Sequence, residues 1–149
     1  YHYLVPELSP QTRFDGGPDW YFEHIAEALA AGHPVKPVLI GPVTFLRLAK
    51  AGGGADRLAL LEPLARAYAR ILGRLRGMGI EWVQIDEPAL CLELEPAWLD
   101  AFDRAYPILA AEAPALLLAT YFDAADEHAD RVLRLPVRGI HIDLVRAPG

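Results

Sequence analysis

Short apolar runs alternate along the chain with longer stretches in which apolar residues recur at helical spacing. Continuous apolar runs of this length are typical of strands covered on both faces, and the helical spacing predicts amphipathic helices. The expected strands are residues 1–5, 38–40, 80–86, 116–122 and 139–145. The expected helices are residues 18–31, 44–50, 63–77, 96–107 and 124–133.

Two prolines and one glycine run set the expected boundaries inside this pattern. Pro63 has no amide hydrogen, so we expect a turn before it and a helix that restarts there. Pro107 is expected to kink the next helix or end it early. The glycine run 52–54 does not directly follow a strand, so we interpret it as a surface link and not as a phosphate-binding loop.

The alternation predicts an α/β fold in which about five strands and four main helices form parallel β/α units. Repeats of roughly 25 to 45 residues are compatible with the roughly 30 residues per unit of a (βα)8 TIM-type barrel. Two arrangements remain possible: an open doubly wound sheet, or residues 1–149 as a single domain that forms part of a barrel. Polar or turn residues end every expected strand on the same side, which favours the barrel mouth.

The chain is acidic, with 14 basic and 20 acidic residues and a formal net charge of −6. This balance argues against a nucleic-acid partner. No apolar run reaches the roughly 20 residues that cross a bilayer, and the start lacks the order of a signal peptide, so we expect no membrane contact and a cytoplasmic protein. The single cysteine, Cys91, excludes an internal disulfide and is expected to be a small buried residue.

The central candidate for chemistry is the pair of carboxylates that follows the third expected strand. Strand side chains alternate, so Asp86 shares a face with Trp82 and Gln84 while Glu87 faces the other way. Pro88 ends the strand, which leaves both carboxylates at the carboxyl-terminal rim, where chemistry collects in parallel α/β folds. Asp86 is equally compatible with a catalytic role and with capping the next loop.

A second set of candidates comes from the other strands. His141 and Asp143 are two residues apart on an expected strand, so they would share a face and could ligate a metal, form an acid/base pair or be packed by hydrogen bonds. No third ligand is evident. His2 on the first strand and Thr120 at the end of the fourth complete the candidate substrate-binding residues.

Five segments in this order carry a family resemblance: 1–7 (YHYLVPE), 36–45 (KPVLIGPVTF), 80–90 (IEWVQIDEPAL), 120–122 (TYF) and 139–145 (GIHIDLV). Together they resemble the N-terminal domain of cobalamin-independent methionine synthase over nearly the whole chain. The resemblance implies transfer of a methyl group from methyltetrahydropteroyl-polyglutamate to homocysteine without cobalamin. It also implies two (βα)8 barrels related by duplication, with the active-site zinc in the C-terminal one.

When the family's functional residues are matched to this sequence one by one, most of them have no counterpart here. In the family's catalytic half, the aspartate of the Ile-Asp-Glu-Pro motif helps to hold the homocysteine amino group, whereas Asp86 belongs to the sister barrel. The His-x-Cys zinc pair of that half has no counterpart at 120–122, and Cys91 alone cannot supply the thiolates. The resemblance therefore implies zinc ligands outside this chain, a C-terminal catalytic barrel as partner, folate-tail contacts chiefly upstream of Tyr1, and no catalytic residue here.

Two other functions remain open. One is a stand-alone β/α enzyme that uses Asp86 or Glu87 as general acid or base, with Asp143 as the second carboxylate. The other is a non-catalytic module that self-associates through its open sheet edges. If the family resemblance holds, we expect the chain to be inactive by itself.

Overall fold

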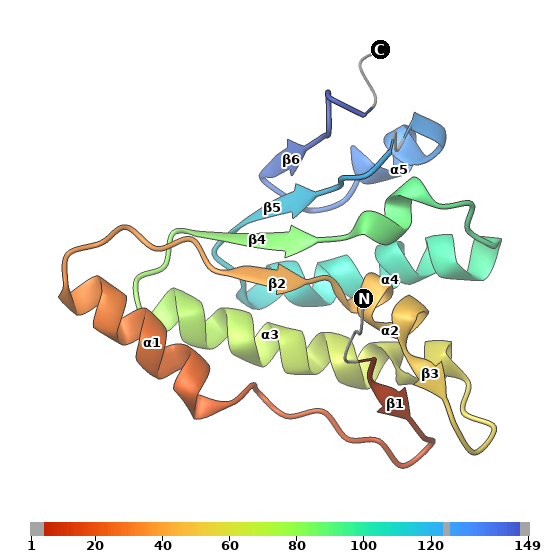
Figure 1. Cartoon of the computed structure of the whole chain (residues 1–149), viewed down its shortest axis with the longest axis horizontal. Helices are drawn as coiled ribbons and strands as arrows, with labels where there is room; N and C mark the ends of the chain where they lie inside the picture. The colour runs from red at the N-terminus through yellow and green to blue at the C-terminus, as the bar shows by residue number, and fades with distance from the viewer. Residues whose placement is uncertain (1–4, 124–125, 147–149) are drawn as a thin grey trace.

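The computed structural model describes residues 5–123 and 126–146, and strands and helices alternate along them (Figure 1). The strands are β1 (Glu7–Leu8), β2 (Val38–Ile40), β3 (Lys50–Ala51), β4 (Trp82–Asp86), β5 (Ala115–Ala119) and β6 (Gly139–His141). The α-helices are α1 (Asp19–Ala30), α2 (Pro42–Leu48), α3 (Leu61–Gly77), α4 (Pro96–Glu112) and α5 (Ala129–Val132). Three 3-10 turns, η1 (Arg57–Leu60), η2 (Pro88–Cys91) and η3 (Asp126–His128), join them.

The main sheet is parallel throughout, with strands in the order β2-β4-β5-β6. Strand order follows chain order without a reversal, whereas a doubly wound sheet reverses its order at a switch point. Side chains on one face of β4 are buried under the helices, while those on the other face are partly or largely exposed. The sheet is therefore singly wound, as consecutive units of a (βα)8 barrel are, and the predicted parallel α/β fold is confirmed.

The core lies between the sheet and the two long helices α3 and α4, which pack against each other (Figure 1). Each helix presents one apolar stripe, and the covered face of the sheet supplies the third wall. The largest fully buried side chains include Leu72, Leu75, Ile85, Phe102, Tyr106, Leu116 and Leu118. Arginines of α3 lie outside this core, where Arg66 pairs with Glu62 and Arg74 with Asp19.

The restart expected at Pro63 is wrong, and of the two outcomes expected at Pro107, the early end of the helix is wrong. The helix does not restart at Pro63 but begins at Leu61, so Pro63 occupies the first turn, where amides have no helical partner to lose. Likewise, α4 does not end at Pro107 but continues to Glu112. Fully buried contacts of Tyr106 and Leu109 on either side of Pro107 hold the helix, because tertiary packing outweighs local propensity.

The amino-terminal part differs most from the prediction. Residues 1–4, which include His2 and most of the first expected strand, lie outside the described residues. After them, the structure has an unpredicted small parallel pair of β1 and β3, in which Lys50 N donates to Pro6 O at 2.9 Å. Helix α2 therefore ends at Leu48, and Lys50, expected to be helical, lies in a strand.

The last two expected strands are shorter than predicted. Strand β5 ends at Ala119, and Phe122, expected inside it, has a backbone φ of 88°, which a strand cannot contain. Strand β6 ends at His141 because Asp143 Oδ1 accepts hydrogen bonds from Val145 N at 3.0 Å and Arg146 N at 3.1 Å, which turns the chain.

Candidate functional site

Asp86 is the last residue of β4 and lies on the open face of the sheet, at the carboxyl-terminal rim. Gln84 Nε2 donates to Asp86 Oδ1 at 2.8 Å, and the Tyr121 hydroxyl donates to Oδ2 at 3.2 Å. Lys36 Nζ in turn donates to Gln84 Oε1 at 2.6 Å. Burial, followed by the nearby Asp86 carboxylate, raises the pKa of Tyr121 to about 12, so this hydroxyl stays a donor at neutral pH. The rim thus presents a carboxylate that is oriented from both sides.

Glu87 lies on the opposite face and is fully buried between the sheet and the helices. Its carboxylate accepts hydrogen bonds from Thr44 N at 2.8 Å, Val43 N at 3.3 Å and the Tyr106 hydroxyl at 3.3 Å. Burial raises the pKa of Glu87 to about 7, although these hydrogen bonds act in the opposite direction. No exposed surface remains through which a substrate could contact Glu87. The alternation predicted from the sequence thus separates the two carboxylates.

His141 and Asp86 lie in one row across the open face, with Ala119 of β5 between them. Thr120, the next residue, is buried, and its amide and hydroxyl both donate to His141 O, at 3.1 and 3.2 Å. His141 Nδ1 lies 3.2 Å from Thr120 O. Thr120 and His141 therefore bind each other across the ends of β5 and β6.

Asp143 lies beyond the end of β6, so the shared strand face expected for His141 and Asp143 does not form. Its Oδ2 atom accepts a hydrogen bond from Phe122 N at 3.4 Å, in addition to the two amides that Oδ1 accepts. The backbone hydrogen bond from Arg146 is the main reason that the pKa of Asp143 is lowered. Asp143 therefore organises the two rim loops.

Three rim or face residues were missed by sequence reasoning. Phe122 is 69% exposed, contacts the Tyr121 ring edge-to-face at 4.7 Å and has the positive φ noted above. Such a conformation in a non-glycine residue is uncommon and often marks a functional loop. Gln84 and Lys36 orient Asp86, and only the alternation of β4 gave a signal for Gln84.

The described residues do not fit a zinc site. Within ranges 5–123 and 126–146, no three His, Cys, Asp or Glu side chains gather so that they could hold a metal ion. Cys91 is half-buried, which corrects the prediction of a buried residue, and its thiol donates to Asp123 O at 3.1 Å. Burial raises the pKa of the Cys91 thiol, which disfavours the thiolate that binds metal.

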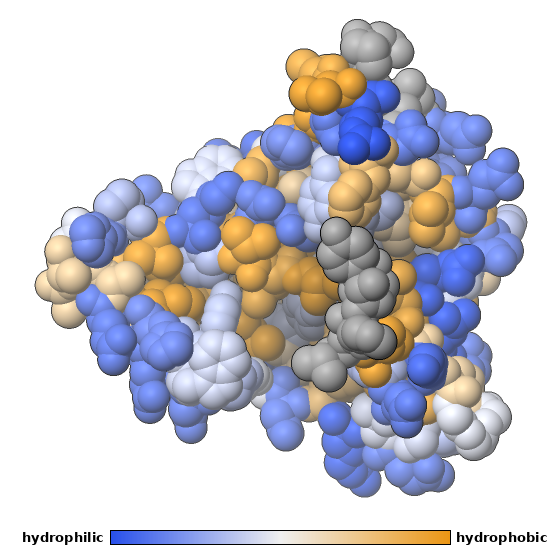
Figure 2. All heavy atoms as spheres, viewed as in Figure 1, coloured by the Kyte–Doolittle hydropathy of each residue, from blue (hydrophilic) through white to orange (hydrophobic). Residues whose placement is uncertain are grey.

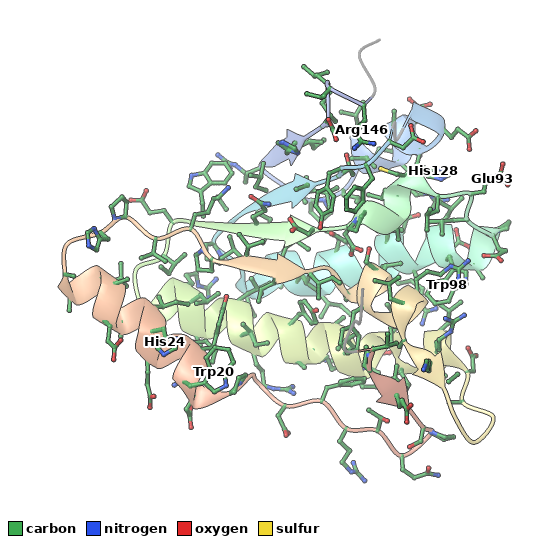
Figure 3. The ribbon with its side chains drawn as sticks, in the orientation of Figure 1. Trp20, His24, Glu93, Trp98, His128 and Arg146 are labelled. Atoms are coloured by element: carbon green, nitrogen blue, oxygen red, sulfur yellow. The ribbon has the colours of Figure 1, made fainter. Side chains whose placement is uncertain are left out.

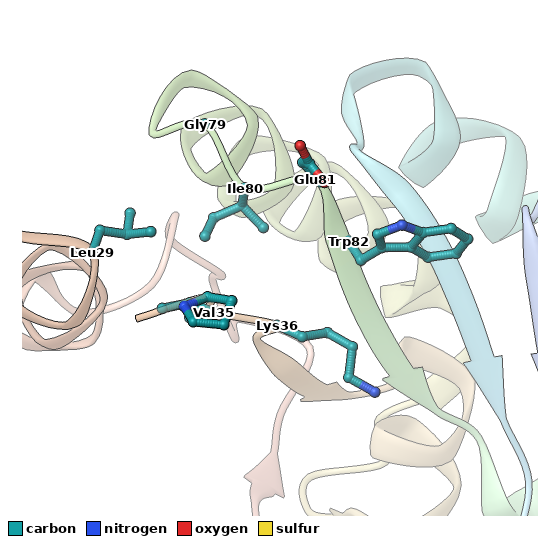
Figure 4. A pocket seen from close by; sticks show the side chains of 8 residues that line it. Leu29, Val35, Lys36, Gly79, Ile80, Glu81 and Trp82 are labelled. Atoms are coloured by element: carbon teal, nitrogen blue, oxygen red, sulfur yellow. The ribbon is translucent and has the colours of Figure 1, made fainter. Parts of the chain in front are cut away.

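Two clefts lie at opposite ends of the strands. A cleft of about 330 Å³ follows β4 and includes Cys91, Glu93 and His128, two of which are labelled in Figure 3. The other cleft, of about 450 Å³, lies at the amino-terminal ends of β2 and β4 (Figure 4). Its wall includes Trp82, whose indole extends over the neighbouring strand toward Gly139, where a Cβ would lie in ordinary van der Waals contact with the ring, at 3.5 Å.

Exposed apolar side chains gather on the open face of the sheet, and Figure 2 shows apolar surface in the middle of the corresponding view. Val38 is 49% exposed, Ile40 41% and Trp82 40%. Contiguous apolar surface of this kind is typical of a face that another segment or protein covers. Among the described helices, none is long and apolar enough to cross a membrane.

A singly wound parallel sheet with helices on one face and polar groups at its carboxyl rim defines a β/α protein of the TIM-barrel type. The family model described as "Cobalamin-independent synthase, N-terminal domain" matches residues 1–149, and the chain belongs to this family.

Curated relatives agree with this assignment. The 5-methyltetrahydropteroyltriglutamate–homocysteine methyltransferase of Paraburkholderia xenovorans is 62% identical over 149 residues, which are 99% of this chain and 20% of that protein. The proteins of the same name from Paraburkholderia phytofirmans and Ralstonia pickettii are 60% and 56% identical, each over 99% of this chain and 20% of the relative. The chain thus spans about a fifth of the length of the curated relatives it matches.

Proposed function

We propose that this chain forms part of the N-terminal barrel of a methyltransferase that makes methionine. The complete protein would transfer the methyl group of 5-methyltetrahydropteroyl-polyglutamate to homocysteine without cobalamin, in the cytoplasm. The observation that carries this proposal is the family match over residues 1–149, supported by relatives at 56–62% identity. The five ordered sequence motifs agree with it.

Within that protein, the role of this chain is scaffolding, not chemistry. Methyl transfer to a thiol needs an activated thiolate and a positioned methyl donor. The described residues offer no set of zinc ligands, and Glu87 is enclosed where a substrate cannot reach it. The proposal therefore places zinc and its ligands outside this chain, in a C-terminal catalytic barrel of the same protein that binds homocysteine.

The open face of the sheet supports a partner within the same protein. Val38, Ile40 and Trp82 expose large apolar areas on the face that would line a closed barrel. Further β/α units would cover this face and pair with β2 and β6, which are the edge strands of the main sheet among the described residues. When those units are absent, we expect the same edges and face to drive self-association.

A methyl-transfer assay with zinc tests the proposal in two steps. The 149-residue chain alone, supplied with methyltetrahydropteroyl-polyglutamate and homocysteine, is expected to form no methionine. The full-length protein is expected to form methionine, and a zinc chelator should abolish that activity. Methionine formation by the chain alone would overturn the scaffolding role.

One alternative keeps some support from the geometry. Asp86 lies at the rim, is only partly buried and is held by Gln84 and Tyr121, which is the arrangement that a general base in a stand-alone enzyme would have. Full activity of an Asp86→Asn variant of the complete methyltransferase would leave this carboxylate without a catalytic role. Loss of activity with unchanged stability would assign it one.

A further inference from the structure

Two loops at the rim are joined by hydrogen bonds in both directions. Glu87, directly after β4, accepts from the backbone amides of Val43 and Thr44 in the first turn of α2. In the other direction, the hydroxyl oxygen of Thr44 accepts a hydrogen bond from Ala89 N, in the loop after β4, at 3.2 Å. Each loop thus uses a side chain to satisfy buried backbone amides of the other, which would otherwise cost free energy.

The backbone next to this contact is fitted to the carboxyl group. A Cβ atom on Gly41 would lie 2.0 Å from Glu87 Cδ and 2.1 Å from Oε1, distances that no pair of such atoms tolerates. Gly41 N also donates to Asp86 O at 2.7 Å, and Glu87 N donates to Ala119 O at 2.8 Å. The carboxyl group is therefore held at the point where the ends of β2, β4 and β5 meet.

Among residues 5–123 and 126–146, the groups that contact Glu87 are hydrogen-bond donors without a positive charge. The hydroxyl of Tyr106 in α4 donates to the Glu87 carboxylate. The charge of Glu87 also raises the pKa of Tyr68 in α3. Asp86, the residue before Glu87, is acidic as well. Tyr121, beyond the end of β5, is a further titratable group whose pKa the charge of Glu87 raises. A buried carboxylate without a cation is costly, and binding a proton removes that cost.

Both protonation states can be satisfied in this setting. The amides of Val43 and Thr44 can only donate, so they bind the carboxylate form. The hydroxyls of Thr44 and Tyr106 can donate or accept, so either one can receive the hydrogen of a protonated Glu87. A protonated Glu87 therefore has an acceptor for its own hydrogen within the cluster.

We propose that Glu87, Thr44 and Tyr106 form a proton-binding latch that couples the start of α2, and with it the rim around Asp86, to the protonation of one buried carboxyl group. The ionised latch draws the amides of Val43 and Thr44 onto the carboxylate by charge-assisted hydrogen bonds. The protonated latch binds these amides more weakly. This coupling acts within the chain and does not depend on the reaction that the complete protein performs.

Selective labelling of threonine with ¹⁵N tests the latch, because the sequence contains only Thr12, Thr44 and Thr120. The amide signal of Thr44 is expected to shift sigmoidally with pH, with a midpoint of about 7. Thr12, whose amide donates to Ser9 O in a surface turn, serves as the internal reference and should not follow this transition.

Variants identify the group that titrates. Glu87→Gln should abolish the transition of Thr44, whereas Glu81→Gln, a change of the same kind at an exposed position before β4, should leave it unchanged. Tyr106→Phe removes a hydrogen bond that favours the ionised form, so it should raise the midpoint. A Thr44 amide that does not titrate in the unmodified chain, or that still titrates in Glu87→Gln, would overturn the proposal. The first of these outcomes decides the matter even if Glu87→Gln fails to fold.

Discussion

The two faces of β4 lie in opposite environments although their side chains alternate along five residues. On the helix side, Val83, Ile85 and the adjacent Glu87 are fully buried. On the other side, Trp82 is 40% exposed, and Gln84 and Asp86 are only partly buried. The covered face is part of a fully packed core, whereas the open face exposes apolar surface that is usually buried in a folded protein. Stability and recognition are thus divided between neighbouring residues.

The same division separates Asp86 from Glu87. The carboxylate on the open face is only partly buried, and Gln84 and Tyr121 hold it by hydrogen bonds. A carboxylate on the covered face can only act on the protein itself, through α2 and α4. Two adjacent acidic residues in one motif therefore need not have the same role.

The largest expected effect on stability comes from truncating an isoleucine on each face of the sheet to alanine. Ile85→Ala should lower the free energy of unfolding by about 2–5 kcal/mol, because it leaves a cavity in the covered core. Ile40→Ala, at an open-face position that is 41% exposed, should cost about 1 kcal/mol or less. Urea denaturation of both variants measures the difference. Equal losses would mean that the open face is packed in solution.

The next effect is the pH dependence that Glu87 gives to stability. Its pKa is 4.5 in the unfolded reference and about 7 when folded, so the folded state holds the proton over this range while the unfolded state releases it. The contribution of Glu87 to stability is therefore largest below pH 4.5 and falls as pH rises to about 7, by about 3 kcal/mol in total at about 1.4 kcal/mol per pKa unit.

Thermal unfolding at a series of pH values checks this slope. Glu87→Gln cannot ionise, so its curve should lack the fall that the unmodified chain shows between these two pH values. Glu95→Gln, at an exposed acidic residue before α4, should keep the fall. A fall that is equally large in Glu87→Gln would assign the titration to another group.

A smaller effect concerns association through the open face. Val38→Lys adds a charge to the exposed edge strand β2 and should weaken self-association of the chain by about tenfold or more, equivalent to about 1.4 kcal/mol. Leu133→Lys makes the same change at a residue that is 73% exposed after α5, and should have no such effect. Sedimentation equilibrium over a range of concentrations compares them. Identical dissociation constants for both variants would locate the contact elsewhere.

The smallest effect should come from Tyr121→Phe, which removes one hydrogen bond from Asp86. A partly exposed hydrogen bond of this kind contributes about 0.5–1.5 kcal/mol to stability. The same variant should leave the buried latch intact, so the Thr44 amide should keep its midpoint. A large change in that midpoint would show that the two faces are coupled through β4.

Much of the fold could be predicted because its signals are local. The apolar runs gave the parallel strands β2, β4, β5 and β6, and alternation along β4 correctly separated Asp86 from Glu87. The pairing of β1 with β3 could not be predicted, since two-residue strands carry almost no pattern and are fixed by contacts distant in sequence.

The position of the candidate site could also be predicted from the sequence, but its hydrogen bonds could not. Its position at the rim followed from Pro88, but the partners of each carboxylate did not. Glu87 contacts Thr44 and Val43, which are more than 40 positions away in the chain, and no spacing rule connects them. The positive φ of Phe122 is likewise a product of the loops around it, including Asp143, and not of its own preference.

The exposed ring of Trp82 gives the chain an optical reporter. Because this indole extends across the neighbouring strand and is 40% exposed, any segment that comes to cover this end of the open face must contact the ring and exclude water from it. Tryptophan emission moves to shorter wavelength when water leaves. Binding of such a segment could therefore be followed in real time by fluorescence, without attaching a dye.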